Sequence, residues 1–404
     1  MASNDEFFQR PQAAAVLKHG VLRRYSTVFA TMAGTRTGRV VYFDAFAGQG
    51  RYDDGSPGSP LLAMRTAATT AGWGRQVECL FAEADPAKAA LLSSALAAEA
   101  PEGFRYQVWP GDAATHVDRA LGVAGNDPML TFLDPFGTAL DYSSLTDKLL
   151  RRPSSSPTEV LLNLNLEMVS RIGGILDSGA PRPHDAKTLA RLDAFFGDQW
   201  WRQVFSDSRG DRGPGSAAQA AQAVAAEFVR RVKAATGFGY FGVPVRRRPG
   251  HHPLFLLILF TRVPVAPWRF NDAVSQANAD WREHCWRQDL DRTISELSAE
   301  PDLFGEWTAQ HAQESEHEAW LRQQRELEQQ WQDDIGRNLV ALAAAKGPDR
   351  LLHHVRAVYG TCLGSAREKH VRAAWDARAA AGELAPRDKS VKHLEQAVLA
   401  LPQA

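Results

Sequence analysis

Apolar residues recur along the first part of the chain in short runs, and helical segments separate these runs. Residues 13–33 carry apolar side chains at helical spacing and predict an amphipathic helix. Short β-branched and aromatic runs bounded by turn residues predict buried strands. These runs lie at 39–44, 78–83, 104–109, 129–134 and 159–164. The alternation predicts an α/β fold, a Rossmann-like parallel sheet with helices on both faces.

The pattern changes near residue 239. Two further apolar runs, 239–246 and 253–262, flank an Arg-Arg-Pro-Gly-His-His segment and predict an antiparallel hairpin at the end of the sheet. The sheet is therefore expected to be mostly parallel, with a terminal antiparallel hairpin. We place this first domain at residues 1–300.

The last hundred residues have another composition. Residues 301–345 hold three Lys and Arg against nine Asp and Glu and predict a long polar helix or linker. Residues 346–404 hold ten Lys and Arg against six Asp and Glu and predict a small helical domain, for which a winged-helix arrangement is one option. Its expected helices are 350–359, 366–381 and 391–401.

Charge and cysteine content narrow the class of protein. The formal net charge is −1, so a nucleic-acid partner would have to be held by local basic patches. The three cysteines, Cys79, Cys285 and Cys362, are too far apart for a CxxC zinc site and do not suggest a disulfide framework. No run approaches the roughly 18 apolar residues of a membrane span. We therefore expect a cytoplasmic protein with no membrane partner.

Metal ligands are not indicated. The histidine pairs His251-His252 and His353-His354 have no third ligand at metal spacing, so no metal site is assigned.

The first predicted strand ends in a loop that suits a nucleotide-like ligand. Asp44, Phe46, Gly48 and Gly50 belong to it, and its glycines allow a tight turn close to a ligand. A dinucleotide fingerprint would need a third glycine where Asp53 stands. The carboxylate of Asp44 instead suits a ligand with a cationic ammonium group, as S-adenosylmethionine has. A tight turn without any ligand is the alternative.

Acidic residues also follow the next two predicted strands. Glu83 ends one strand, where a carboxylate can accept hydrogen bonds from both ribose hydroxyls. Asp112 and Ala113 follow the other, where a carboxylate and a backbone N–H can meet an adenine ring. Each acid alone could be a solvated strand end. Together they favour a cofactor site at the carboxyl edge of the sheet.

The fourth predicted strand runs into Asp134-Pro135-Phe136-Gly137, our candidate catalytic segment. The Asp134 carboxylate and the Pro135 carbonyl can accept the two N–H bonds of an exocyclic amine, which localises its lone pair for methyl transfer. Phe136 would stack on the extruded base, and Gly137 would permit close approach. The alternative is that Asp134 caps a helix and Phe136 belongs to the core.

Several of these motifs resemble a known family. The runs 41–50, 58–62, 81–83, 134–137 and 159–163 resemble the three-Cys-motif partner (TcmP) family, over roughly residues 10–290. The resemblance implies a class I methyltransferase-like fold, in which a mostly parallel sheet closes with an antiparallel hairpin. It also implies a possible protein partner with a cysteine motif, bound through the C-terminal module.

A second, more distant resemblance adds site residues. The segments 15–19, 47–52 and 58–60 are similar to bacterial 23S ribosomal RNA adenine-N6 methyltransferases, and this implies that Lys18, His19, Ser59 and Pro60 lie at the cofactor. That family has Asp-Pro-Pro-Tyr at the catalytic corner. The Asp-Pro-Phe-Gly found here is similar to tRNA guanine-N2 dimethyltransferases, so the accepting base stays open.

Contacts to a nucleic-acid substrate would need basic and aromatic side chains. Arg246, Arg247 and Arg248, in the predicted hairpin loop, are candidate phosphate contacts, with a solvated charge run as the alternative. Basic residues at 367–378 could decorate a recognition helix, or a protein-interaction module. Five tryptophans could stack on bases, although most are expected in the core. They are Trp200, Trp201, Trp268, Trp281 and Trp286.

The leading hypothesis is S-adenosylmethionine-dependent N-methylation of an exocyclic amine on an RNA or DNA base. The alternatives are methylation of a small molecule or peptide, and a non-catalytic binding protein that kept the fold.

Overall fold

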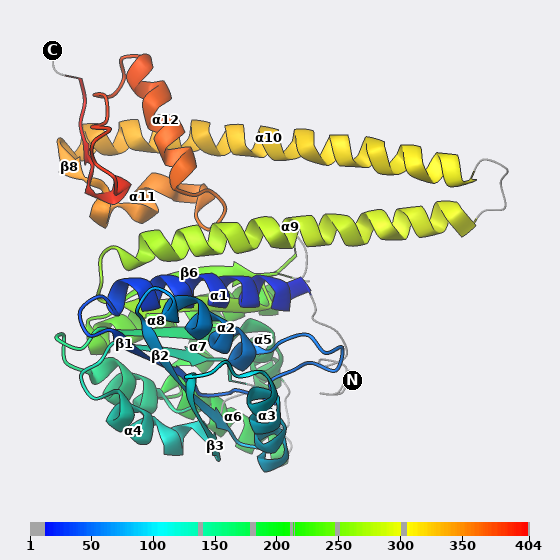
Figure 1. Ribbon diagram of the computed structural model, residues 1–404, viewed down its shortest axis with the longest axis vertical. Coiled ribbons are helices and arrows are strands. Elements are labelled where there is room, and N and C mark those ends of the chain that lie inside the picture. The colour runs from blue at the N-terminus through cyan, green and yellow to red at the C-terminus, as the bar shows by residue number, and fades with distance from the viewer. Residues whose placement is uncertain are drawn as a thin grey trace. The chain divides into compact units, whose positions relative to one another are not determined.

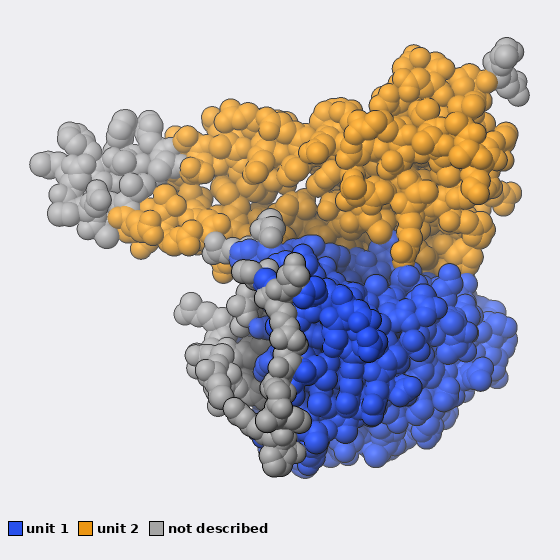
Figure 2. All heavy atoms as spheres, turned by 180° about the vertical axis from the view of Figure 1, so that it is seen from behind, with its two compact units in different colours: residues 1–262 blue, residues 263–404 orange. Residues whose placement is uncertain are grey.

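The computed structural model describes residues 13–135, 140–177, 183–210, 213, 215–246, 251–299 and 305–402 (Figure 1). Contacts group the chain into two compact units, residues 1–262 and 263–404 (Figure 2). Phe136, Gly137, Arg247 and Arg248 lie outside the described residues.

A seven-stranded sheet forms the centre of the first unit. Its strand order is β3-β2-β1-β4-β5-β7-β6. β7 runs antiparallel to both neighbours, and all other pairings are parallel. The strands are β1 (Arg39–Asp44), β2 (Gln76–Glu83), β3 (Arg105–Pro110), β4 (Met129–Leu133), β5 (Thr158–Asn165), β6 (Gly239–Val245) and β7 (Phe255–Thr261). This is the predicted Rossmann-like sheet, mostly parallel with a terminal antiparallel hairpin.

The predicted strands are confirmed because their sequences suit burial on both faces. All five residues of β4 are buried, and five of the six in β1. Parallel strands covered by helices on both sides need such continuous apolar runs. The observed strand ends differ from the predicted ones by at most two residues.

Helices cover both faces of this sheet (Figure 1). They are α1 (Ala13–Ala33), α2 (Ser59–Ala71), α3 (Pro86–Glu99), α4 (Ala113–Ala124), α5 (Leu166–Gly173), α6 (Pro183–Phe196), α7 (Trp200–Ser208) and α8 (Ser216–Thr236). A π-helical turn, Ser144–Lys148, and a 3₁₀ turn, Leu149–Arg151, connect β4 to β5.

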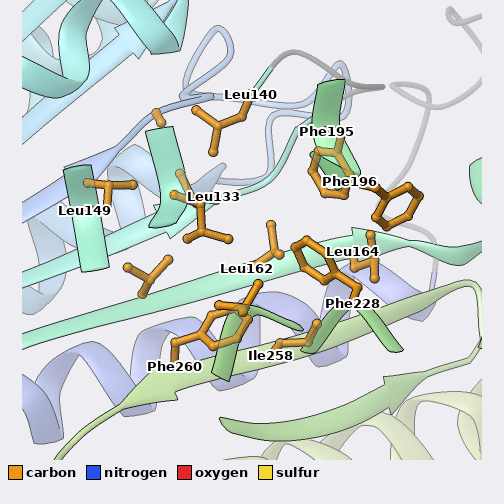
Figure 3. Close-up of a cluster of buried hydrophobic side chains, with 14 of the residues drawn as sticks. Leu133, Leu140, Leu149, Leu162, Leu164, Phe195, Phe196, Phe228, Ile258 and Phe260 are labelled. Carbon is orange, nitrogen blue, oxygen red and sulfur yellow. The ribbon is translucent and has the colours of Figure 1, made fainter. Parts of the chain in front are cut away.

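The largest apolar cluster lies between the sheet and the helices of one face. Leu133 and Leu162 from the sheet pack with Phe195, Phe196 and Phe228 from α6 and α8 (Figure 3). Burial of such side chains stabilises the fold by roughly 1.5–3 kcal/mol each.

The second unit consists of two long helices and a small module. The long helices are α9 (Ala266–Ala299) and α10 (Gly305–Lys346), which form a hairpin (Figure 1). The module holds β8 (Asp349–Arg350), α11 (Val355–Tyr359), α12 (Glu368–Ala380) and β9 (Val398–Leu399), with β8 and β9 paired antiparallel.

The division between the units falls before α9 and thus earlier than the expected boundary at residue 300. The reason is that α9 packs on the C-terminal module. The Trp268 indole donates to the Leu352 carbonyl at 3.0 Å, and the Asn271 amide donates to the Ala366 carbonyl at 2.9 Å. α10 covers most of the segment 301–345, and the elements of the module follow it.

The helix expected at 391–401 is wrong. This segment forms a 3₁₀ turn, Leu394–Gln396, and then β9. Pairing of β9 with β8 satisfies backbone groups that a helix would have satisfied internally.

Candidate active site

Polar side chains gather at one edge of the sheet. Asp44 ends β1, Glu83 ends β2, Asp134 follows β4, and Asn163 lies near the end of β5. These four strands are parallel neighbours, with Asp44 opposite Phe132 and Leu133 opposite Leu162. Their carboxyl ends therefore meet, at the edge where open α/β sheets bind ligands.

The loop after β1 is held in a tight turn against β2. The Gly48 N–H donates to Glu83 Oε2 at 2.8 Å, and the Ala47 N–H donates to the Ala82 carbonyl at 2.9 Å. Gly48 and Gly50 have φ values of 66° and 86°, a region that favours glycine. A Cβ on Gly50 would also come within 2.9 Å of the Leu92 side chain. The two glycines are thus needed for the loop's path.

Asp44 is fully buried beneath this loop. Its Oδ1 accepts from the Phe46 N–H at 3.2 Å, while its Oδ2 has no hydrogen-bond partner of good geometry among the described residues. Burial raises the pKa of Asp44 to about 7, although the Ser59 hydroxyl and the Phe46 N–H oppose the shift. A buried carboxylate with one unused oxygen fits a ligand that brings a positive charge.

The cofactor assignments of Ser59 and Pro60 fall at the start of α2. Gly58 is the N-cap of this helix, without a side-chain capping bond, and its N–H donates to the Gly50 carbonyl at 2.8 Å. The bond ties the first turn of α2 to the glycine loop. Ser59 and Pro60 therefore stand beside the loop, and their contact with a cofactor stays a prediction from the resemblance.

Asp134 is held on both carboxylate oxygens. The Lys18 ammonium donates to Oδ2 at 2.5 Å, and the Asn163 amide donates to Oδ1 at 2.6 Å. The Lys18 and Asp134 side chains are only 9% and 16% exposed. Burial lowers the pKa of Lys18, but the Asp134 carboxylate outweighs it, so the pKa lies above its ordinary value. The ion pair fixes the orientation of the carboxylate.

Lys18 and His19 come from α1. The His19 Nε2 atom lies 3.2 Å from the Tyr52 hydroxyl, and the two rings are 5.5 Å apart. Burial, and then the charge on Lys18, lower the pKa of His19 to about 3. His19 is therefore neutral and links α1 to the segment after the glycine loop.

Glu83 and Asp112 keep hydrogen-bonding capacity for a ligand. Glu83 accepts one backbone bond on each oxygen, from the N–H groups of Gly48 and Asp85. A carboxylate oxygen has a second lone pair, so each can accept once more. Asp112 is the exposed N-cap of α4 but makes no side-chain capping bond, and Ala113 begins the helix.

Of the remaining candidate catalytic and phosphate-binding residues, the structure describes only Pro135 and Arg246. Pro135 is buried next to Asp134. Arg246 follows β6, whose Val245 pairs with Phe255, which in turn pairs with Asn165 of β5. Arg246 thus stands at the same edge of the sheet, half-buried, and burial lowers the pKa of its guanidinium.

Two residues at this site were not assigned from the sequence. Asn163 lies in the run 159–163 and Tyr52 in the segment 47–52, and both stretches resemble known families, but the resemblance assigned neither residue a role. Both act through partners far away in the chain, Asp134 and His19, which spacing alone does not reveal.

The second unit holds the basic residues that were candidates for a recognition helix or a protein-interaction module. Basic side chains of α12 are paired within the unit: Lys369 with Glu328, Arg372 with Glu368, and Arg378 with Glu383. Trp268 and Trp281 are buried, like Trp201 in the first unit, as expected of core tryptophans.

Among the described residues, no cluster of three metal-ligating side chains occurs. In the same part of the chain, no helix has the length and apolar character that a membrane span requires.

No family model and no curated protein matches the chain. Solved structures match weakly. A protein from Legionella pneumophila, LPL1258, is 12% identical over 67% of this chain and 92% of its own, with a TM-score of 0.37. The methyltransferase domain of bacterial CtHen1 is 12% identical over 59% and 97%, with a TM-score of 0.31. The plantazolicin methyltransferase BamL is 9% identical over 60% and 85%, with a TM-score of 0.28. Such likeness carries no argument, so the fold assignment rests on the strand order and directions.

Proposed function

We propose that this protein binds S-adenosylmethionine at the carboxyl edge of its sheet. The donor set fits the cofactor group by group. Asp44, with its unused buried oxygen, suits the ammonium. Glu83 suits the ribose hydroxyls, and Asp112 with the Ala113 N–H suits the adenine ring. A Cβ at Gly48 would meet no atom within 4 Å, so the chain leaves open space above this residue.

We further propose that the reaction is methyl transfer to an exocyclic amine of an RNA or DNA base. The cofactor supplies an activated methyl group that carries its own leaving group. The chain's part is to aim the amine. Asp134 can accept one N–H on a remaining lone pair, and the Pro135 carbonyl can accept the other.

The observation that carries the proposal is the double hold on Asp134. Lys18 holds one carboxylate oxygen and Asn163 holds the other, so the acceptor is oriented before substrate arrives. Preorganised acceptors of this kind stabilise positive charge that develops on the amine nitrogen. Phe136 stacking on the base and Arg246–Arg248 contacting phosphates complete the proposal.

The cofactor assignment can be tested by calorimetric titration with S-adenosylmethionine. We expect binding by the wild-type protein and roughly 30-fold weaker binding by Glu83→Ala, because two hydrogen bonds to a charged group are lost. Asp118→Ala is a matched control, since this acid of the same unit is 68% exposed and pairs only with Lys148 among the described residues. Absence of wild-type binding, or equal affinities for Glu83→Ala and wild type, would exclude the proposed site.

A further inference from the structure

A recess of about 380 Å³ lies on the first unit, apart from the cofactor residues. Its walls include Tyr142, Phe196, Trp200, Arg230 and Arg231. Tyr142 belongs to the segment that leaves the Asp134 corner, eight positions after Asp134. Phe196 ends α6, Trp200 begins α7, and the arginines lie on α8. The recess thus joins aromatic rings to two cationic side chains.

The aromatic walls are fixed in place. The Trp200 indole donates to the Phe196 carbonyl at 3.0 Å, and the two rings lie 5.5 Å apart, edge to face. Gly197 has a φ of 84°, and a Cβ there would come within 2.7 Å of the Tyr142 ring. The Phe196 side chain belongs to the buried apolar cluster that also includes Phe195 and Phe228 (Figure 3). The recess is therefore formed before any ligand binds.

The arginines are oriented by one carboxylate. Glu227 accepts from Nε and Nη2 of Arg230, at 2.7 and 2.6 Å, and from Nε of Arg231 at 2.7 Å. The Arg231 guanidinium lies over the Trp200 ring, 4.5 Å from its centroid. The bonds to Glu227 use only part of each guanidinium, and within the described ranges the Nη groups of Arg231 and Nη1 of Arg230 stay available for a ligand.

We propose that this recess binds one nucleotide of a single-stranded nucleic acid. A base stacks on the Arg231–Trp200 pair beside Tyr142, and the adjoining phosphate accepts from the arginine N–H groups. Single strands are bound in this way, by stacking on aromatic rings and guanidinium planes together with phosphate contacts. The lining holds Arg230, Arg231 and one acid, Asp198, and Glu227 pairs with both arginines, so the arginines act through directed N–H groups and not through an excess of positive charge.

The inference rests on the proposed function, because the bound strand is the methyl acceptor. It makes that substrate a strand with at least one nucleotide besides the reacting base. Its test measures binding and does not depend on methyl transfer.

The experiment is fluorescence anisotropy with a short labelled single-stranded RNA of mixed sequence, and with the DNA of the same sequence. Arg231→Lys keeps the charge but removes the guanidinium plane, and we expect roughly tenfold weaker binding. Arg230→Gln should weaken binding and lower the slope of log affinity against log salt. The matched control is Arg65→Gln, an exposed arginine on α2 of the same unit. Thermal unfolding checks that each variant folds.

Wild-type affinity in both recess variants would overturn the inference, as would an equal loss in Arg65→Gln. Competition by adenosine monophosphate at the same concentration as the strand would also overturn it, because the recess would then select a free nucleotide. Titration of S-adenosylmethionine separates the two proposals. If the cofactor binds and the strand does not, the recess inference fails alone. If the strand binds through the recess and the cofactor does not, the methyl-transfer proposal fails alone.

Discussion

At the scale of single residues, the proposed role of Asp44 predicts that cofactor binding depends on pH. Burial raises the pKa of Asp44 to about 7, so the carboxylate that would meet the ammonium is formed only as the pH rises through this value. We expect affinity for S-adenosylmethionine to be roughly tenfold weaker at pH 6 than at pH 8. Asp44→Asn should bind weakly and without this pH dependence. Titration calorimetry at several pH values would show it, and a flat wild-type profile would contradict the role of Asp44.

A second prediction for single residues is that Lys18 and Asp134 are coupled in their effect on stability. Lys18→Met leaves a largely buried carboxylate without its cation, so we expect a loss of about 3 kcal/mol in the free energy of unfolding. Adding Asp134→Asn should recover part of this loss, because the charge that needed compensation is gone. Urea unfolding measures both variants. If the two losses simply add, the ion pair does not couple these residues.

The sequence indicated some of these residues directly and others only through resemblance or not at all. Asp44 and Glu83 were predictable because a strand, a glycine loop and an acid are close together in the chain. Lys18 was nominated only by resemblance, since its partner Asp134 is 116 positions away. Asn163 needs the same long-range information: its amide meets Asp134 only because β4 and β5 pair in this register.

At the scale of elements, α1 is anchored to the sheet by a buried carboxyl group. Glu159 of β5 accepts from the Tyr25 hydroxyl at 2.7 Å and from the Thr261 hydroxyl at 2.8 Å. Tyr25 lies two turns after Lys18 on α1, so this anchor also sets the position of Lys18. Burial raises the pKa of Glu159 to about 7, against the opposing effect of both hydroxyls.

The raised pKa has a consequence for stability. The neutral carboxyl group is favoured in the folded state, so its contribution is complete below the unfolded pKa of 4.5 and is lost as the pH rises to about 7. We expect Glu159→Gln to abolish this pH-dependent part of the free energy of unfolding, which amounts to about 3 kcal/mol between those pH values. Chemical denaturation of both proteins at pH 5 and pH 8 tests it. Equal pH dependence in the two proteins would contradict the assignment.

Strand and helix positions in the first unit followed from apolar periodicity, because each element buries a continuous apolar run. The structure of residues 391–401 did not follow from periodicity. The segment is short, and its pairing with β8 depends on residues about 50 positions earlier in the chain. The grouping of α9 with the second unit could not be predicted from the sequence either. It depends on contacts such as that of Asn271 with Gly364 and Ala366.

At the scale of the whole molecule, all assigned cofactor residues lie in the first unit. We expect calorimetry of the full chain to resolve two unfolding transitions. S-adenosylmethionine at about 100 times its dissociation constant should stabilise one of them by about 3 kcal/mol and leave the other unchanged. A single transition, or an equal shift of both, would show that the units unfold together.

The central claim is that Asp134 directs methyl transfer to a nucleic-acid base. In the most direct test, the purified protein is incubated with labelled S-adenosylmethionine and with total RNA or DNA from cells that lack the protein. The nucleosides are then analysed by mass spectrometry. We predict one N-methylated nucleoside with wild type and with the control Asp118→Asn, and roughly 100-fold less with Asp134→Asn. No methylated nucleoside from a wild-type protein that binds the cofactor, or equal amounts from Asp134→Asn, would contradict the account.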